Sequence, residues 1–287
     1  MAPLMAPAPP APTTFADLGV PDPIVAALAR LDRPAPFAIQ VAAVPDALAG
    51  HDVLGRARTG SGKTLAFAIP MVTRLSTSGS RRQKGRPRGL VLVPTRELAQ
   101  QVHDALRPLA DAVGQRTTTV VGGVSQAPQV TALRRGVDVL VATPGRLEDL
   151  IRQGHLRLDA VEVTALDEAD HMADLGFLPA VRRLLDATPS RGQRLLFSAT
   201  LDGDVDVLVR RYLDNPRGHS VDEPSGSVPD MKHRLVTVRA QHKREIVHEM
   251  LSGPERTLAF TRTKHAARAL ARRLTEAGVP SLDLHGN

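Results

Sequence analysis

Short apolar runs alternate with helical patterns along the first two hundred residues of the chain. Most of these runs, such as 89–93, are apolar and lack the polar–apolar alternation of a strand with one solvated face. Strands of this kind belong in a parallel sheet that is covered on both faces. We expect six of them, at residues 52–54, 89–93, 117–121, 137–142, 161–166 and 194–197.

The segments between these runs have the spacing of helices. One helix is expected after Thr95, which is suited to its N-cap, because apolar residues recur there at helical intervals. These residues are Leu98, Val102, Leu106 and Leu109. Strand and helix therefore alternate, which predicts an α/β fold with a doubly wound parallel sheet.

The composition changes near residue 214 and divides the chain. Residues 214–230 are rich in Pro, Gly and Ser and poor in apolar residues, which is typical of a linker. Beyond it we expect strands and helices again, but only 57 residues remain, well below the roughly 100–150 of an ordinary domain. The predicted organisation is a disordered Ala/Pro-rich tail (1–13), a complete domain (14–213), a linker (214–230) and a partial second domain (231–287). The later strands are expected at 234–238, 257–260 and 282–284, with helices around 246–250 and at 264–277.

Charge and composition narrow the classes of partner and compartment. The chain has 37 basic and 30 acidic residues, for a net charge of +7, which favours a polyanion as partner. It contains no Cys, so disulfides and thiol chemistry are excluded and a reducing compartment is favoured. There is no apolar run long enough for a membrane span, and the N-terminal segment lacks the features of a signal peptide. We expect a soluble, cytoplasmic protein.

Two polar segments at the ends of apolar runs together predict a nucleotide site. They are Ala57-Arg58-Thr59-Gly60-Ser61-Gly62-Lys63-Thr64 and, about a hundred residues later, Asp167-Glu168-Ala169-Asp170. A glycine-rich turn between a strand and a helix directs backbone N–H groups at phosphate oxygens. Residues 59–62 are then the cradle for ATP, Lys63 meets the β- and γ-phosphates, and Thr64 is a ligand of Mg²⁺.

The acidic segment supplies the other half of this site. Asp167 at the end of a buried strand is expected to hold Mg²⁺, and Glu168 to orient or deprotonate the attacking water. Alone, the glycine-rich loop also fits an ordinary turn, because Ala57 stands where the strict pattern has Gly. An acidic run alone also fits a solvated surface. The two segments in this order favour the nucleotide site.

An ordered series of short motifs resembles the DEAD-box ATP-dependent RNA helicases over most of the chain. The series is Phe15 with Pro36-Phe37-Ala38-Ile39-Gln40 (the Q motif), Ala57–Thr64 (motif I), Pro94-Thr95-Arg96-Glu97-Leu98-Ala99 (motif Ia), Gly122-Gly123, Thr143-Pro144-Gly145-Arg146, Asp167–Asp170, Ser198-Ala199-Thr200 (motif III) and Leu258-Ala259-Phe260-Thr261 (motif IV). The resemblance implies a RecA-like P-loop domain followed by part of a second RecA-like domain.

The same resemblance assigns roles to individual residues. Phe15 and Gln40 are expected to contact the adenine, while Asp170, Ser198 and Thr200 couple the nucleotide site to RNA. The expected RNA contacts are Pro94, Thr95, Arg96, Gly122, Gly123, Thr143, Pro144, Gly145 and Arg146. With six Phe, one Tyr and no Trp, the chain offers few surfaces for base stacking, so we expect RNA to be held by its backbone, largely independently of sequence.

The chain departs from the family pattern in three places. Phe37-Ala38 stands where Thr-Pro is usual and Arg58 where Gln or Glu is common, and the sequence ends before motifs V and VI. Because the resemblance places arginines that stabilise the transferring phosphoryl group in those motifs, we expect the chain as given to bind ATP and RNA but to hydrolyse ATP poorly. Two alternatives stay open: a nucleotide-switched RNA-binding module without turnover, and another P-loop NTPase that acts on DNA.

Overall fold

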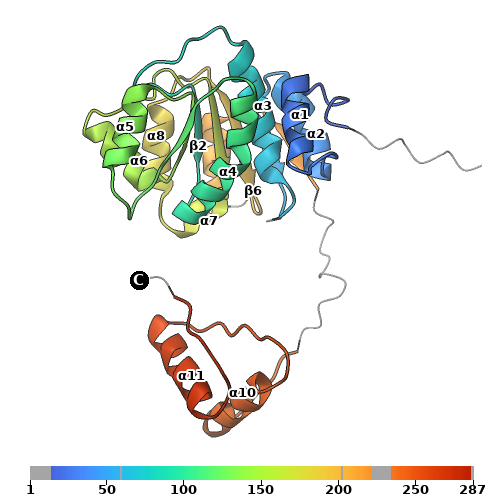
Figure 1. The fold of residues 1–287 in the computed structure, drawn as a ribbon, viewed down its shortest axis with the longest axis vertical. Coiled ribbons are helices and arrows are strands. Elements are labelled where there is room, and N and C mark those ends of the chain that lie inside the picture. Colours follow the sequence, from blue (N-terminus) through green and yellow to red (C-terminus); the bar gives the residue numbers. More distant parts are fainter. Residues whose placement is uncertain (1–13, 59, 202, 222–233, 286–287) are drawn as a thin grey trace, which may run out of the picture. The chain divides into compact units, whose positions relative to one another are not determined.

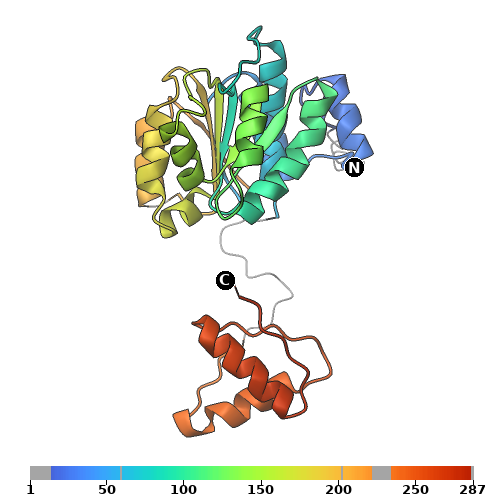
Figure 2. The same ribbon diagram turned by 60° about the vertical axis from the view of Figure 1, so that its left-hand side comes forward.

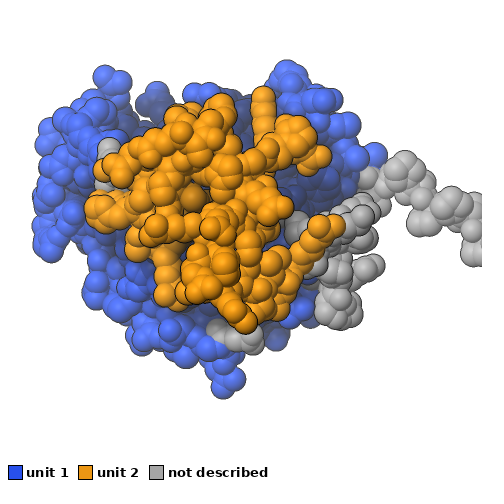
Figure 3. Space-filling view, turned by 90° about the horizontal axis from the view of Figure 1, so that it is seen from below, with its two compact units in different colours: residues 1–225 blue, residues 226–287 orange. Residues whose placement is uncertain are grey.

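The computed structural model describes residues 14–58, 60–201, 203–221 and 234–285. The chain divides into two compact units, residues 1–225 and 226–287, which are coloured separately in Figure 3. The predicted tail at 1–13, Thr59 and residues 222–230 of the predicted linker lie outside the described residues.

A seven-stranded parallel sheet forms the centre of the first unit (Figure 1), which confirms the predicted fold class. The strand order is β3-β4-β2-β5-β6-β1-β7, and every pairing is parallel. The strands are β1 (Val53–Arg56), β2 (Gly89–Leu92), β3 (Thr117–Val120), β4 (Val139–Ala142), β5 (Val163–Asp167), β6 (Gln193–Ser198) and β7 (Arg217–Ser220). All six strands that the sequence predicts for the first domain are present, with ends shifted by up to two residues.

The seventh strand corrects the prediction for the linker. β7 lies inside the segment expected to be a loop, and it pairs with β1 so that Arg217 lies opposite Val53. Its sequence, Arg-Gly-His-Ser, has no apolar residue, and most of it is exposed at the edge of the sheet. An edge strand of this kind depends on backbone hydrogen bonds rather than on apolar burial, so hydrophobic patterning does not reveal it.

Helices cover both faces of the sheet (Figure 2). One face packs against α1 (Asp22–Arg30), α2 (Ala38–Leu48), α3 (Lys63–Thr77) and α4 (Arg96–Ala112); the other packs against α5 (Ala127–Arg135), α6 (Pro144–Arg152), α7 (Ala169–Asp174), α8 (Leu178–Asp186) and α9 (Asp204–Tyr212). The predicted N-cap of α4 is confirmed, because the Thr95 hydroxyl accepts a hydrogen bond from the Leu98 N–H at 3.2 Å.

Successive residues of the central strands serve two cores. In β6, Leu195 and Phe197 pack with α1–α4, while Leu196 packs with the helices of the other face. This two-sided burial explains why the central strands carry apolar residues in succession, as at Leu195-Leu196-Phe197. Phe197 lies 5.7 Å from the Phe67 ring centroid and also covers Gly55 of β1, where a Cβ atom would overlap its ring.

The second unit contains two of the predicted helices but none of the predicted strands within its described residues. They are α10 (Lys243–Leu251) and α11 (Lys264–Glu276), preceded by the short 3₁₀ helix η1 (Ala240–His242). The strands expected at 234–238, 257–260 and 282–284 are not formed, because these segments have no hydrogen-bonded neighbour there. Leu235, Phe260 and Leu282 are accordingly almost fully exposed.

None of the helices in the described ranges has the length and apolar character needed to span a membrane.

The contact between Gly55 and Phe197 predicts a stability difference. Gly55→Ala should lower the free energy of unfolding by about 1–3 kcal/mol, because the added methyl overlaps a buried ring in a close-packed core. Gly218→Ala in β7 is the matched control, since its Cβ would meet open space, and it should change stability by less than about 0.5 kcal/mol. The measurement is urea unfolding, and equal midpoints for the two variants would contradict the prediction.

Candidate nucleotide and RNA site

The phosphate loop connects the end of β1 to the start of α3. Gly60 and Gly62 have φ angles of +87° and +91°, a left-handed conformation that glycine adopts without strain. Gly62 is the N-cap residue of α3, and Lys63 begins the helix with only 6% of its surface exposed. The loop therefore turns sharply into a helix N-terminus, which is the backbone arrangement that binds phosphate.

The Ser61 hydroxyl in this loop is a candidate ligand contact. Its oxygen is buried and has no hydrogen-bond partner. A buried hydroxyl without a partner is costly, and an oxygen-rich group at the loop would remove that cost. The residues present thus fit a bound phosphate chain.

Asp167 lies at the carboxyl end of β5, on the same edge of the sheet as the phosphate loop. Only β6 separates β5 from β1 in the strand order. The carboxylate is 3% exposed and accepts one hydrogen bond, from the Glu168 N–H at 3.1 Å. Burial raises the pKa of Asp167 to about 6, although the nearby Lys63 ammonium opposes the shift. A cation bound beside this carboxylate would stabilise its negative charge in place of the water that burial has removed.

Mg²⁺ would need further ligands from the nucleotide. No group of three or more His, Asp or Glu side chains that could hold a metal occurs among the described residues. This agrees with the usual Mg²⁺ site of nucleotide enzymes, where one or two protein ligands act with phosphate oxygens and water.

Glu168 has a backbone conformation that is unusual for a residue other than glycine. Its φ and ψ angles are 54° and 53°, and it stands at the N-cap of α7. Such left-handed residues cost energy and cluster at functional sites. Its Oε2 atom lies 3.2 Å from Nδ1 of His171, one helical turn further along. The sequence analysis did not select His171, although its i+3 spacing from Glu168 at a helix start is visible in the sequence.

Asp170 joins the acidic segment to the end of β6. Its N–H donates to the Ser198 hydroxyl at 3.2 Å, while its Oδ2 accepts from the Thr200 N–H at 3.0 Å and from the Thr200 hydroxyl at 3.1 Å. Burial opposes ionisation of Asp170, but hydrogen bonds from Ser198, Thr200 and His171 outweigh it and lower the pKa. The three residues predicted to couple the sites thus form one hydrogen-bonded group.

The residues expected to recognise adenine are occupied within the protein. Phe15 is 1% exposed and belongs to the hydrophobic core, so its ring face is not open to a base, contrary to the expectation. The Gln40 side chain accepts from the Phe37 N–H at 2.9 Å and donates to the Gly62 carbonyl at 2.8 Å, so both ends of its amide are used. The aromatic ring that lies against the loop with 52% of its surface exposed is Phe37, which the sequence analysis noted only as a departure from the family pattern.

The segments predicted to contact RNA follow β2, β3 and β4, which are neighbours in the sheet. Two contacts connect them. Arg146 donates to the Val124 carbonyl at 3.1 Å, and a Cβ atom on Gly123 would lie 3.3 Å from the Arg96 guanidinium. Arg96 also donates to Glu97 at 2.6 Å, a hydrogen bond that raises the pKa of Arg96 and lowers that of Glu97.

Two glycines in these segments have no structural reason to be glycine. Gly122 and Gly145 do not have positive φ angles, and a Cβ atom at either would meet nothing within 4 Å. A missing side chain in open space is suited to the close approach of a ligand backbone. The Thr143 side chain makes no capping hydrogen bond at the start of α6, whereas the Thr95 side chain caps α4.

The geometry of the site and the similarity to known proteins together identify the class and family of the chain. A parallel sheet with a phosphate loop after β1 and a buried carboxylate after β5 defines the class of P-loop nucleoside triphosphatases. The family described as DEAD/DEAH box helicase matches residues 37–208. The chain belongs to the DEAD/DEAH box helicase family.

Curated relatives share this similarity over nearly the whole chain. The chloroplastic DEAD-box ATP-dependent RNA helicase 3A of Zea mays is 42% identical over 281 residues, which cover 95% of this chain and 37% of the relative. The RNA helicase CrhR of Synechocystis is 37% identical over 278 residues, covering 96% and 55%. The ATP-dependent RNA helicase RhlB of Pseudomonas aeruginosa is 35% identical over 282 residues, covering 96% and 71%. The chain thus spans about a third to seven tenths of the length of these proteins.

Burial of Asp167 predicts a pH-dependent stability. Because its pKa is raised to about 6, the folded chain binds this proton more tightly than the unfolded chain does. The resulting stabilisation is complete below the ordinary value of 3.8 and is lost as the pH rises through about 6. Asp167→Asn should remove this dependence, so the variant should gain up to roughly 3 kcal/mol relative to the parent between pH 4 and pH 7.

Urea unfolding of both chains at several pH values, without nucleotide or Mg²⁺, measures this difference. Asp206→Asn, which removes an exposed carboxylate from α9, is the control and should follow the parent. A constant difference between Asp167→Asn and the parent across this range would show that Asp167 ionises normally.

Proposed function

We propose that this chain is the ATP- and RNA-binding core of an ATP-dependent RNA helicase that couples ATP hydrolysis to local separation of RNA duplexes. The observation that carries the proposal is the arrangement along one edge of the sheet. The phosphate loop, the acidic segment, the hydrogen-bonded group of Asp170, Ser198 and Thr200, and the RNA segments all follow carboxyl ends of parallel strands. A ligand in one part of this edge can therefore influence the next.

The phosphate loop binds the nucleotide in this proposal. Backbone N–H groups of residues 60–62 and the N-terminus of α3 hold phosphate oxygens, and Lys63 places a positive charge beside the β- and γ-phosphates. Thr64 and Asp167 hold Mg²⁺, which when bound neutralises charge on the phosphates. The buried Ser61 hydroxyl gains a hydrogen-bond acceptor.

Glu168 orients the attacking water or accepts its proton. Glu168 follows the last residue of β5 in a left-handed backbone conformation, and its carboxylate contacts His171. Asp170 transmits the state of this segment to the end of β6 through Ser198 and Thr200.

RNA is bound through its phosphates and 2′-hydroxyl groups along the ends of β2, β3 and β4. The contacts available there are guanidinium groups, hydroxyls and backbone N–H groups, which suit phosphate oxygens and 2′-hydroxyl groups. Binding is therefore largely independent of sequence. The lack of Cys fits a reducing compartment, and we place this activity in the cytoplasm.

Lys63 provides the first test of the nucleotide site. Lys63→Ala should weaken binding of Mg²⁺–ATP at least about tenfold, because a buried ammonium beside the phosphates is lost. Lys84→Ala, which removes an exposed ammonium elsewhere in the first unit, is the matched control and should bind like the parent. Isothermal titration calorimetry measures both affinities, and equal values for the two variants would remove Lys63 from the site.

A substitution at Gly145 distinguishes a contact with RNA from a structural role. Gly145→Ala should leave stability unchanged or raise it by up to about 1 kcal/mol, because alanine favours the helix and its methyl meets open space. The same methyl should weaken binding of single-stranded RNA about tenfold by keeping the RNA backbone away. Gly218→Ala, equally open but on the far edge strand β7, should leave RNA affinity unchanged.

Thermal melting and fluorescence anisotropy with a labelled RNA of mixed sequence give the two readouts. Parent-like RNA affinity in a stable Gly145→Ala variant would remove the segment 143–146 from the RNA site.

A further inference from the structure

Four exposed arginines lie on the connections that lead into β2, β3 and β4. They are Arg81 before β2, Arg116 before β3, and Arg134 and Arg135 at the end of α5, before β4. We call them the arginine cluster. Because the three strands are parallel, the cluster lies at their amino ends, whereas the segments predicted to contact RNA follow the carboxyl ends of the same strands. The proposed nucleotide and RNA contacts do not use it.

A buried carboxylate fixes these connections to one another. The side chain of Asp138, just before β4, is 3% exposed. It accepts hydrogen bonds from Nε of Arg82 at 2.6 Å and from the backbone N–H of Arg116 at 2.9 Å. The loop before β2 is also held to the end of α5, because the Gly85 N–H donates to the Leu133 carbonyl at 3.0 Å. The cluster therefore belongs to three segments that are bonded together and not to a free loop.

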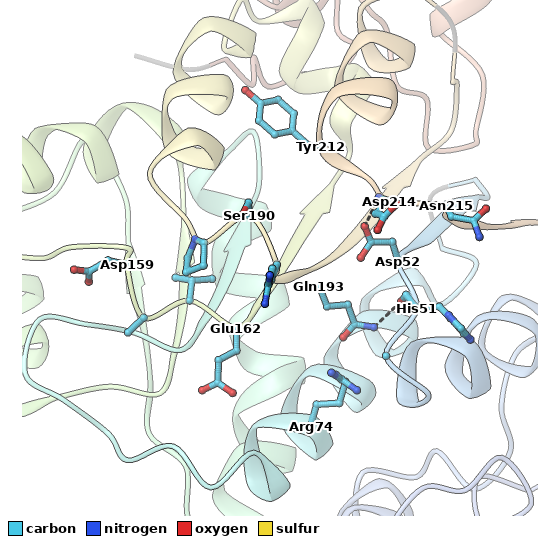
Figure 4. A pocket seen from close by; sticks show the side chains of 16 residues that line it. His51, Asp52, Arg74, Asp159, Glu162, Ser190, Gln193, Tyr212, Asp214 and Asn215 are labelled. Carbon is cyan, nitrogen blue, oxygen red and sulfur yellow. Dashed lines mark hydrogen bonds between the residues drawn. The ribbon is translucent and has the colours of Figure 1, made fainter.

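Other arginines nearby are paired with carboxylates. Arg82 contacts Asp138, while Arg86 and Arg157 both contact Asp159. Figure 4 shows Asp159 at the lining of a neighbouring hollow, which lies at the amino ends of β1, β5 and β6. In contrast, none of the four cluster side chains has an ion-pair or hydrogen-bond partner within the described part of the chain. Their charge is therefore available to a ligand.

The surroundings of the cluster contain few negative charges. The connections 78–88, 113–116 and 136–138 carry one carboxylate, that of Asp138, which is buried. The exposed carboxylate closest to the cluster along the chain is Asp111 of α4, which offsets one of the four positive charges at most. Like charges held together repel each other unless an anion lies among them, and guanidinium groups bind phosphate through paired hydrogen bonds. The cluster thus favours a phosphate-bearing polyanion.

RNA is the polyanion that the fold favours. β2, β3 and β4 have four residues each, so roughly 13 Å of strand separates the cluster from the segments predicted to contact RNA. β3 is the outermost strand on that side of the sheet. An RNA strand bound at the carboxyl ends can therefore continue past this edge to the amino ends. An acidic polypeptide has no such second attachment.

We propose that the arginine cluster binds the phosphate backbone of an RNA strand that extends beyond the contacts at the carboxyl ends of β2, β3 and β4. The inference rests on the proposed RNA binding. The guanidinium groups pair with phosphate oxygens, so the cluster adds affinity for longer RNAs whatever their sequence.

Replacing the two cluster arginines of α5 tests the proposal. Arg134→Gln/Arg135→Gln should weaken binding of a single-stranded RNA of about 20 nucleotides at least about tenfold and leave binding of an RNA of about 6 nucleotides unchanged. The slope of log K against log[salt] for the longer RNA should fall by about 1.4, because each lost phosphate contact contributes about 0.7. Fluorescence anisotropy with labelled RNAs of mixed sequence gives both quantities.

Arg210→Gln/Arg211→Gln is the matched control. These arginines are also neighbours in the last turn of an exposed helix, α9, but each is paired with a carboxylate, Arg210 with Asp206 and Arg211 with Asp186. The control should bind both RNAs like the parent. In the unaltered chain, the salt slope should be steeper for the longer RNA than for the shorter one, by up to about 2.8 for the four cluster arginines. This second comparison needs no variant and decides the proposal even where a variant fails to fold.

The outcomes separate this contact from the first RNA site. Gly145→Ala should weaken binding of both RNAs, whereas the α5 variant should affect only the longer one. Equal salt slopes for the two RNAs in the parent, parent-like binding of the longer RNA by folded Arg134→Gln/Arg135→Gln, or tighter cluster-dependent binding of a poly-glutamate peptide of similar length would each overturn the proposal. Failure of the parent to bind the shorter RNA would instead contradict the proposed function, on which the inference depends.

Discussion

Parallel pairing of β1, β5 and β6 is the constraint on which the rest of the structure depends. Their register aligns Asp167 with Phe197 and Arg56 with Ser198, so all three strands end at the same level. The phosphate loop, the acidic segment and the hydroxyls after β6 therefore meet without any of them needing a long connection. The same pairing places Gly55 opposite Phe197, whose ring covers the position that a Cβ atom on Gly55 would take. The parallel register of these strands therefore positions both the buried core residues and the residues of the candidate site.

The sequence predicts this part of the molecule well because buried strands and phosphate-binding segments have recognisable residue patterns. Strand-like runs locate six of the seven strands, and the glycine-rich and acidic segments locate the edge where a nucleotide fits. The failures have physical causes. β7 is an exposed edge strand held by backbone hydrogen bonds, so its residue types are free to be polar. The strand-like segments of the second unit have suitable residues but no neighbour to pair with among the described residues. Hydrophobic pattern reports what a segment can bury, not whether a partner is present.

The roles of individual side chains were harder to foresee than their positions. Phe15 was expected at a base and lies in the core, whereas Phe37 was noted only as a departure and presents its ring beside the loop. Both are aromatic, and only the tertiary packing decides which face is covered. The contact of His171 with Glu168 and the lack of partners for the arginine cluster among the described residues likewise depend on side-chain orientation. Spacing along the chain brings such groups near each other but does not show which of their atoms remain without partners.

The hydrogen bonds of Gln40 have a consequence for how a base is discriminated. Its amide already has a donor and an acceptor inside the protein, at Phe37 and Gly62, so a base that engages it exchanges bonds and does not add them. Such an exchange contributes little to overall affinity, because as many bonds are lost as are formed. A base that cannot match the amide leaves both of these internal bonds in place. On our proposal that Gln40 contacts the adenine, preference among bases therefore depends on how well the new pair of bonds replaces the old pair, and not on a gain in their number.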